Sequence, residues 1–189
     1  MNWPTASIWL LPPAGSEVES KLHRLIATAL PDVFPNARLP LFPPHITLTN
    51  EVDPSLDPHT VTSSVEVSAS PVIKFEKVDI GKTFFTRITL HLEKTEEITA
   101  LAVQCRIKYV TKGNVEEAKK WAEGFTPHLS LVYMEEVPGP EEVKKVEEEV
   151  ASAGIKFGVE AWTGGRLALV GFPRCFFTTH KRLTHLVVR

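Results

Sequence analysis

The chain has few cysteines, no long apolar run and no excess of basic residues, and each absence excludes a class of protein. Its two cysteines, Cys105 and Cys175, are far apart, so zinc-ribbon and thioredoxin spacings are absent and a reducing compartment is expected. No apolar stretch approaches about 18 residues and no basic segment precedes one near residue 1, so we expect neither a membrane span nor a signal peptide. With 21 basic and 23 acidic residues, the net charge of −2 disfavours a long nucleic-acid partner.

What is present is the composition of a folded globular protein. Of its 189 residues, 43% are hydrophobic and 23% are charged. A chain of this length can bury a core without disulfides or metals. We therefore expect residues 1–189 to form a single domain.

Hydrophobic periodicity predicts a mixture of strands and helices, which is an α+β fold. The predicted strands span residues 6–11, 45–49, 72–80, 84–92, 128–134, 155–161, 167–170 and 183–188. The predicted helices span 16–30, 96–110 and 141–153, with a short helix near 58–68. Ser16 is a suitable N-cap and Pro31 is expected to end the first helix, whereas residues 111–124 resemble a polar loop with at most a helical turn.

A seven-residue pattern occurs twice and is the most informative feature of the sequence. Residues 42–48 read FPPHITL and residues 125–131 read FTPHLSL, each after a predicted strand and helix. The two histidines, His45 and His128, are 83 positions apart (128 − 45). The recurrence predicts a duplication, with units at roughly 5–80 and 84–161. We expect two pseudo-symmetric lobes, each an antiparallel sheet with outer helices, facing each other across a central groove.

The repeated pattern places a histidine beside a hydroxyl. Because side chains alternate along a strand, His45 and Thr47 share one face, as do His128 and Ser130. Two imidazoles can act as general base and general acid near neutral pH, and two hydroxyls can hydrogen-bond phosphate oxygens. Neither histidine has carboxylate or thiolate neighbours suited to a zinc site, so no metal and no cofactor are expected.

The paired His-x-Thr and His-x-Ser segments resemble the two-histidine (2H) phosphoesterase superfamily. Within it, the segments IWLLP at 8–12 and HLSLVY at 128–133 resemble fungal and plant-type cyclic nucleotide phosphodiesterases. The resemblance extends from the first strand through the helix at 141–153. It implies metal-independent hydrolysis of 2′,3′-cyclic nucleotides to 2′-phosphates. It also implies conversion of ADP-ribose 1″,2″-cyclic phosphate, a by-product of tRNA splicing, to ADP-ribose 1″-phosphate.

The same resemblance implies roles for five residues. His45 and His128 would be catalytic, with His128 as base and His45 as acid. Thr47, Ser130 and Tyr133 would bind the substrate. Tyr133 shares strand parity with the core-facing leucines of its segment, so it can reach the site only through a bulge or at a strand end.

The expected partner is a small nucleotide, and the expected state is a cytoplasmic monomer, with peripheral association with Golgi membranes left open. Two alternative functions are an RNA-end-processing 2H enzyme, either 2′–5′ ligase-like or a 3′ exonuclease, and a nucleotide-binding module without catalysis. A short chain without basic excess argues against the first. Two intact motifs argue against the second.

Overall fold

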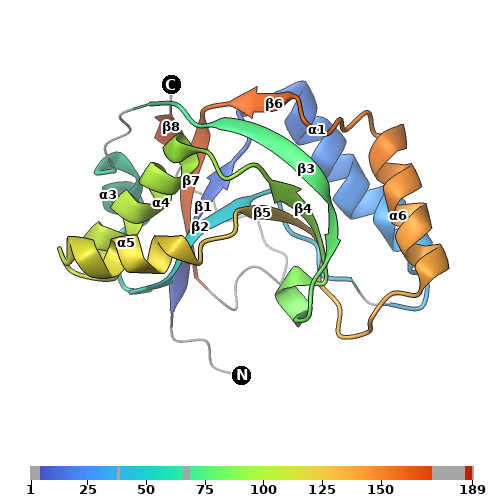
Figure 1. Cartoon of the computed structure of the whole chain (residues 1–189), viewed down its shortest axis with the longest axis horizontal. Helices are drawn as coiled ribbons and strands as arrows, with labels where there is room; N and C mark the ends of the chain where they lie inside the picture. The colour runs from blue at the N-terminus through green and yellow to red at the C-terminus, as the bar shows by residue number, and fades with distance from the viewer. Residues whose placement is uncertain (1–4, 38, 66–68, 172–185, 189) are drawn as a thin grey trace.

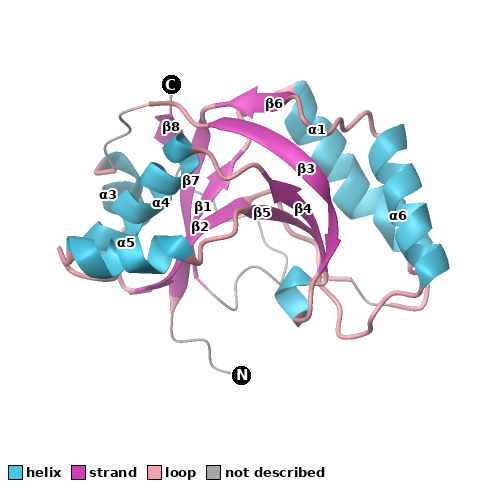
Figure 2. Ribbon diagram, viewed as in Figure 1, coloured by secondary structure: helices cyan, strands magenta, loops and turns pink. Residues whose placement is uncertain are grey.

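The computed structural model describes residues 5–37, 39–65, 69–171 and 186–188. Its strands form one eight-stranded sheet in the order β6-β3-β4-β5-β2-β1-β7-β8, in which all neighbouring strands are antiparallel. Helices flank this sheet, as Figures 1 and 2 show. The predicted α+β class is confirmed.

The strands are β1 (Ala6–Leu11), β2 (Ile46–Val52), β3 (Val72–Ile80), β4 (Ile88–Leu92), β5 (His128–Val132), β6 (Glu160–Thr163), β7 (Gly165–Gly171) and β8 (Leu186–Val188). The helices are α1 (Glu17–Arg24), α2 (Leu30–Val33), α3 (Pro58–Ser63), α4 (Glu96–Tyr109), α5 (Val115–Glu123) and α6 (Pro140–Ser152). A π-helical turn, η1 (Leu25–Ala29), joins α1 to α2, and a 3-10 turn, η2 (Phe84–Thr86), precedes β4.

The sheet consists of two similar halves. In the first, β1 leads through α1 to β2, and β7 flanks β1; in the second, β4 leads through α4 to β5, and β3 flanks β4. β2 and β5 pair where Ile46 lies opposite Leu129, so the two lobes predicted from the repeat are joined edge to edge. In Figure 1, α1 and α6 lie at one end of the molecule and α3, α4 and α5 at the other.

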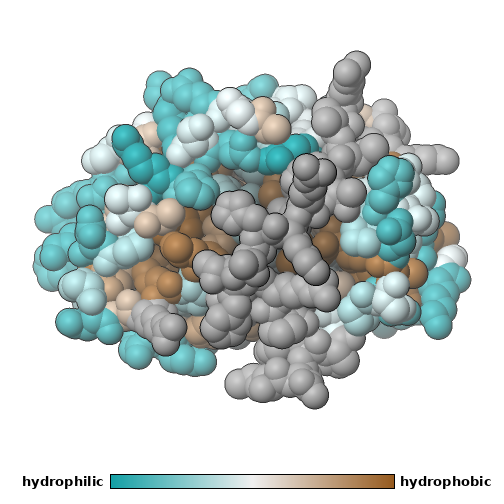
Figure 3. Space-filling model, turned by 180° about the vertical axis from the view of Figure 1, so that it is seen from behind, coloured by the Kyte–Doolittle hydropathy of each residue, from teal (hydrophilic) through white to brown (hydrophobic). Residues whose placement is uncertain are grey.

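The main core lies between the sheet and the helices. Fully buried aliphatic side chains from strands and helices meet there, among them Leu10, Ile46, Leu90, Leu129, Leu22 and Ile98. α4 packs against β2 and η1 against β5, so each connecting helical segment covers the strand of the other half that lies at the junction. Seen from behind in Figure 3, hydrophilic residues gather at the two ends, where the helices lie, and hydrophobic residues show nearer the middle.

The first helix begins as predicted but does not end at Pro31. The Ser16 hydroxyl accepts a hydrogen bond from the backbone N–H of Glu19, as an N-cap does. The chain then widens into η1 and continues as α2 to Val33. Pro31 is tolerated because it lies in the first turn of α2, where its missing N–H is not needed.

The prediction of a loop over residues 111–124 is wrong, because most of this segment is α5. The Asn114 side chain caps the helix by accepting from the N–H of Glu117. Only the small residues Ala118 and Ala122 are fully buried, so the apolar stripe is too weak to be recognised in the sequence.

The boundaries of several other elements also differ from the predictions. The strand predicted over residues 155–161 is wrong in position, since β6 begins at Glu160 after a turn through Gly158 at φ 71°. β4 begins at Ile88 rather than at residue 84, because η2 occupies the preceding residues. The helix predicted near 58–68 ends at Ser63.

Candidate active site

The two histidines of the repeat are held in the same way. His45 immediately precedes β2 and His128 begins β5. The Nδ1 atom of His45 lies 2.8 Å from the carbonyl oxygen of Pro43, and that of His128 lies 2.9 Å from the carbonyl oxygen of Thr126. A carbonyl can only accept, so Nδ1–H donates in each ring. In both rings Nε2 is therefore the nitrogen available for chemistry.

The register between β2 and β5 brings the four predicted polar residues together. The pair Ile46 and Leu129 points into the core, so the flanking pairs point to the opposite face of the sheet. Extending the antiparallel register by one residue each way gives His45 opposite Ser130 and Thr47 opposite His128. Directly opposite side chains start about 4.5–5.5 Å apart at Cβ. We call these four residues the site quartet and the face that carries them the site face.

A bulge in β5 explains how Tyr133 reaches this face. Neighbouring residues of β4 pair with residues of β5 that are two apart: Thr89 with Ser130, and Ile88 with Val132. Leu131 is therefore an extra residue. The side chains that follow it point to the opposite face of the sheet from the one that strict alternation would give them. The bulge that Tyr133 required is thus present. β2 has an extra residue at the equivalent position, Leu48, between the pairs that its neighbours make with β1.

Tyr133 is buried against the site quartet. Its hydroxyl oxygen lies 3.3 Å from Nε2 of His45, which makes a long hydrogen bond. Its ring stacks on Phe42 with centroids 4.1 Å apart and meets the edge of Phe85 at 5.3 Å. Phe42 and Phe85 thus fix the tyrosine hydroxyl beside the available nitrogen of His45.

His45 lies in an apolar enclosure. Trp9 stacks on its ring at 3.5 Å between centroids and 11° between planes, and only 2% of the residue is exposed. Burial, which disfavours the charged imidazolium, lowers the pKa of His45 to about 4; the hydrogen bond to Pro43 opposes this shift, and the nearby His128 adds to it. His45 is therefore neutral at pH 7 in the free protein, whereas His128 is only half-buried.

The two hydroxyls of the quartet differ in their present partners. Ser130 Oγ donates to the backbone carbonyl of Phe85 at 3.0 Å, and the residue is 5% exposed. Thr47 is half-buried beside Trp9, its neighbour across the β1–β2 pair. Ser130 would have to turn from Phe85 to donate to a phosphate oxygen, whereas its lone pairs are available as it stands.

Arg87 holds the loop that carries the aromatic rings, a role that was not predicted. Its guanidinium is buried and donates to three backbone carbonyls: Met134 at 3.2 Å, Gly81 at 3.0 Å and Glu135 at 2.8 Å. These bonds tie η2 to the segment that leaves β5, where Tyr133 lies. One signal was available in the sequence: Arg87 lies two residues before Thr89, so strand alternation places its side chain on the same face as the site.

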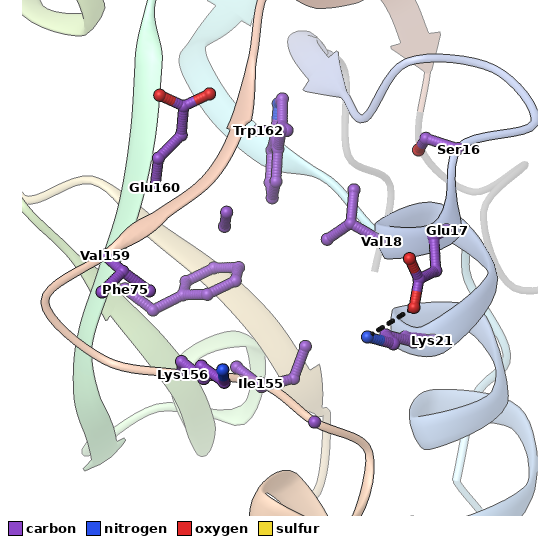
Figure 4. A pocket seen from close by; sticks show the side chains of 12 residues that line it. Ser16, Glu17, Val18, Lys21, Phe75, Ile155, Lys156, Val159, Glu160 and Trp162 are labelled. Carbon is purple, nitrogen blue, oxygen red and sulfur yellow. Dashed lines mark ion pairs between the residues drawn. The ribbon is translucent and has the colours of Figure 1, made fainter.

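Other features lie away from the quartet. Among the described residues, no three His, Cys, Asp or Glu side chains are grouped to hold a metal ion, and no helix could cross a membrane. Cys105 is a free thiol whose burial raises its pKa to about 12, and Cys175 lies outside the described residues. A hollow of about 400 Å³ between α1 and β6, lined by Lys21, Phe75 and Trp162 among others, contains none of the quartet (Figure 4).

The duplicated fold and the paired histidines are those of a two-histidine phosphoesterase. The model of the family described as "cyclic phosphodiesterase-like protein" matches residues 4–172, so the chain belongs to that family. A protein of Phaeosphaeria nodorum is 35% identical over 181 residues, covering 88% of this chain and 91% of its own length. A protein of Neurospora crassa is 30% identical over 198 residues, covering 90% and 93%. Both relatives are named 2′,3′-cyclic-nucleotide 3′-phosphodiesterase, and the resemblance inferred from the sequence is confirmed.

Proposed function

We propose that this protein hydrolyses five-membered cyclic phosphodiesters, opening 2′,3′-cyclic nucleotides to nucleoside 2′-phosphates. The observation that carries the proposal is the matched pair of imidazoles on the site face, each with Nδ1 bonded to a backbone carbonyl and Nε2 available. The names of the relatives from Phaeosphaeria nodorum and Neurospora crassa support the same reaction. ADP-ribose 1″,2″-cyclic phosphate contains the same cyclic phosphate ring and is proposed as a second substrate.

In the proposed reaction the two histidines carry the two proton transfers. His128 is half-buried, so water can reach it, and it takes a proton from the water that attacks phosphorus. The bond from phosphorus to the 3′ oxygen breaks, and His45 gives that oxygen its proton. Since the imidazoles supply both transfers, the mechanism requires no metal ion. Proton exchange with solvent then returns His128 to the neutral form.

His45 must gain a proton before it can act as the acid, and the substrate itself supplies the driving force. The cyclic phosphate carries one negative charge. At about 4 Å and an effective dielectric constant of about 20, that charge stabilises an imidazolium by about 4 kcal/mol, which is worth about three pKa units. A pKa that burial has lowered to about 4 then rises close to neutrality. The reverse assignment would require water to be activated at a residue that is 2% exposed.

The hydroxyls of Thr47 and Ser130 are proposed to bind the non-bridging phosphate oxygens, each beside the histidine of the other half. Tyr133 is proposed to hold Nε2 of His45 in position and to contact the substrate. The predicted small nucleotide partner, monomeric state and cytoplasmic location remain predictions.

The direct test is to incubate the protein with 2′,3′-cyclic AMP and EDTA and to identify the product by chromatography. We expect adenosine 2′-phosphate, formed at least about 10²-fold more slowly by the His45→Ala and His128→Ala variants measured in parallel. Hydrolysis that stops with EDTA and returns with a divalent metal would contradict the metal-free mechanism. Shortening of oligouridine without opening of the cyclic nucleotide would instead indicate an RNA-end-processing enzyme.

A further inference from the structure

The residue that lies beside each histidine on the neighbouring strand differs between the two halves. In the second half, His91 of β4 lies directly opposite His128. In the first half, continuing the pairing of β1 with β2 by one residue places Leu11 opposite His45. Leu11 is 2% exposed, whereas the His91 side chain is 29% exposed. A third imidazole therefore borders the site quartet on one side only.

His91 is oriented by a carboxylate. Its Nδ1 lies 2.9 Å from Oε2 of Glu76, and a carboxylate accepts, so Nδ1–H donates and Nε2 is left available. Glu76 can reach the site face because β3 has a bulge there: Phe75 pairs with Leu92 and Lys77 with His91, which leaves Glu76 as the extra residue. Like the two histidines of the quartet, His91 donates Nδ1–H and leaves Nε2 available, but its acceptor is a carboxylate instead of a backbone carbonyl.

Two acidic residues and one lysine lie around His91. Lys77, opposite His91 on β3, is 3.3 Å from Asp79, and Glu76 accepts from Nδ1 of His91. The Lys77–Asp79 pair is balanced, whereas Glu76 adds a negative charge that disfavours a second phosphate. The available Nε2 of His91 is an acceptor, which suits a hydroxyl group. The corresponding part of the first half contains the apolar cluster of Trp9, Leu11, Ala168 and Val170.

We propose that His91, oriented by Glu76, is a substrate-binding residue whose Nε2 accepts a hydrogen bond from a sugar hydroxyl of the nucleotide whose phosphate occupies the site quartet. The proposal rests on the proposed function and adds a specificity determinant to it. The sugar is attached to the reacting phosphate, and His91 starts about 5 Å from His128, so a group bonded to the phosphate is within its reach. His91 thereby separates cyclic nucleotides from cyclic phosphates that carry no sugar.

The test compares a ligand with a sugar and a ligand without one. His91→Ala should raise KM for 2′,3′-cyclic AMP about three- to tenfold, the loss typical of one hydrogen bond, with kcat changed less than about twofold. It should also weaken binding of adenosine 2′-phosphate by the same factor, measured by calorimetry. The inhibition constant of inorganic phosphate, which has no sugar, should stay within about twofold.

Three further variants separate this role from a structural one. Glu76→Ala should produce part of the effect, and the double variant no more than His91→Ala alone, because the pair acts as a unit. His91→Gln, which keeps a hydrogen-bond acceptor, should recover part of the affinity. The matched control is His59→Ala, which removes an exposed histidine of α3 and should not change the binding of either ligand. Because the Glu76–His91 pair is partly exposed, the thermal midpoints should agree within about 4 °C.

Unchanged binding of both nucleotides in His91→Ala would overturn the inference. An equal loss for inorganic phosphate would overturn it too, since His91 would then act on the phosphate. If the wild type binds adenosine 2′-phosphate in a His91-dependent way but opens no cyclic phosphate, the proposed function fails and the sugar contact stands.

Discussion

The first and second halves of the site face contain equivalent histidines in unlike surroundings. His45 is stacked under Trp9 and is almost fully buried, whereas His128 is half-buried and has His91 as its neighbour. Both rings nevertheless donate Nδ1–H to the carbonyl of the residue two positions earlier. The repeated motif thus determines the direction of each imidazole, and the surroundings determine its protonation state. Two similar halves can in this way supply two different proton-transfer groups.

Two different proton-transfer groups are needed only if neither histidine is dispensable. Removing either histidine is therefore the change with the largest expected effect. His45→Ala and His128→Ala should each lower kcat on 2′,3′-cyclic AMP by at least about 10²-fold, because each removes a proton-transfer partner. The double variant should lose less than the product of the two factors, since the pair acts as a unit. His59→Ala is the control. Near-normal kcat in either single variant would make that histidine structural.

The burial of His45 should also appear in the stability of the protein. Its pKa is about 4 in the folded protein, below the ordinary histidine value of 6.5, so the unfolded chain binds the proton more readily. The stability associated with the neutral ring is therefore fully present above pH 6.5 and is lost as the pH falls towards 4, by about 3 kcal/mol. Urea unfolding of the wild type and of His45→Gln at several pH values measures it. Parallel pH dependence in the two proteins would show that His45 is not the group responsible.

Removing the hydroxyls of the quartet should lower activity less than removing the histidines. Thr47→Ala and Ser130→Ala should each cost about 1–3 kcal/mol of transition-state stabilisation, as hydrogen bonds to charged groups do. Thr47→Ser and Ser130→Thr, which keep the hydroxyl, should recover most of the activity. The readout is kcat/KM on 2′,3′-cyclic AMP. A change confined to KM would mean that the hydroxyls bind the substrate and the transition state equally well.

Tyr133 should give the smallest effect, because its hydrogen bond to His45 is long. Tyr133→Phe keeps the packing on Phe42 and Phe85 and removes only the hydroxyl. We expect the transition-state stabilisation to decrease by about 0.5–1.5 kcal/mol, so that kcat/KM falls roughly two- to twelvefold. The same substitution should leave the free energy of unfolding nearly unchanged. A loss as large as that of His45→Ala would instead place the tyrosine hydroxyl in the chemical step.

The sequence predicted those parts of the molecule that depend on local pattern. β1 and β3 were predicted to the residue, since each is a run of strand-forming residues that a proline or glycine bounds. The grouping of His45 with His128 followed from the repeat. By contrast, α5 was missed because its buried stripe consists of two alanines.

The features missed in the site depend on pairing between strands. The bulge at Leu131, which turns Tyr133 towards His45, is defined only by its partners on β4. The contact between Glu76 and His91 needs a bulge in β3 and joins residues on different strands. One signal was readable: His91 alternates with the apolar residues of its strand and therefore had to face away from the core.

The most direct test of the assignment of His128 as base and His45 as acid uses a substrate that needs no acid. The leaving oxygen of 1,2-phenylene phosphate is a phenolate, which departs without protonation far more readily than a sugar oxygen. On this substrate His45→Ala should lose at least about tenfold less activity than it loses on 2′,3′-cyclic AMP, whereas His128→Ala should lose about 10² on both. If the improved leaving group restores His128→Ala and not His45→Ala, the two roles are exchanged and the assignment of base and acid is contradicted.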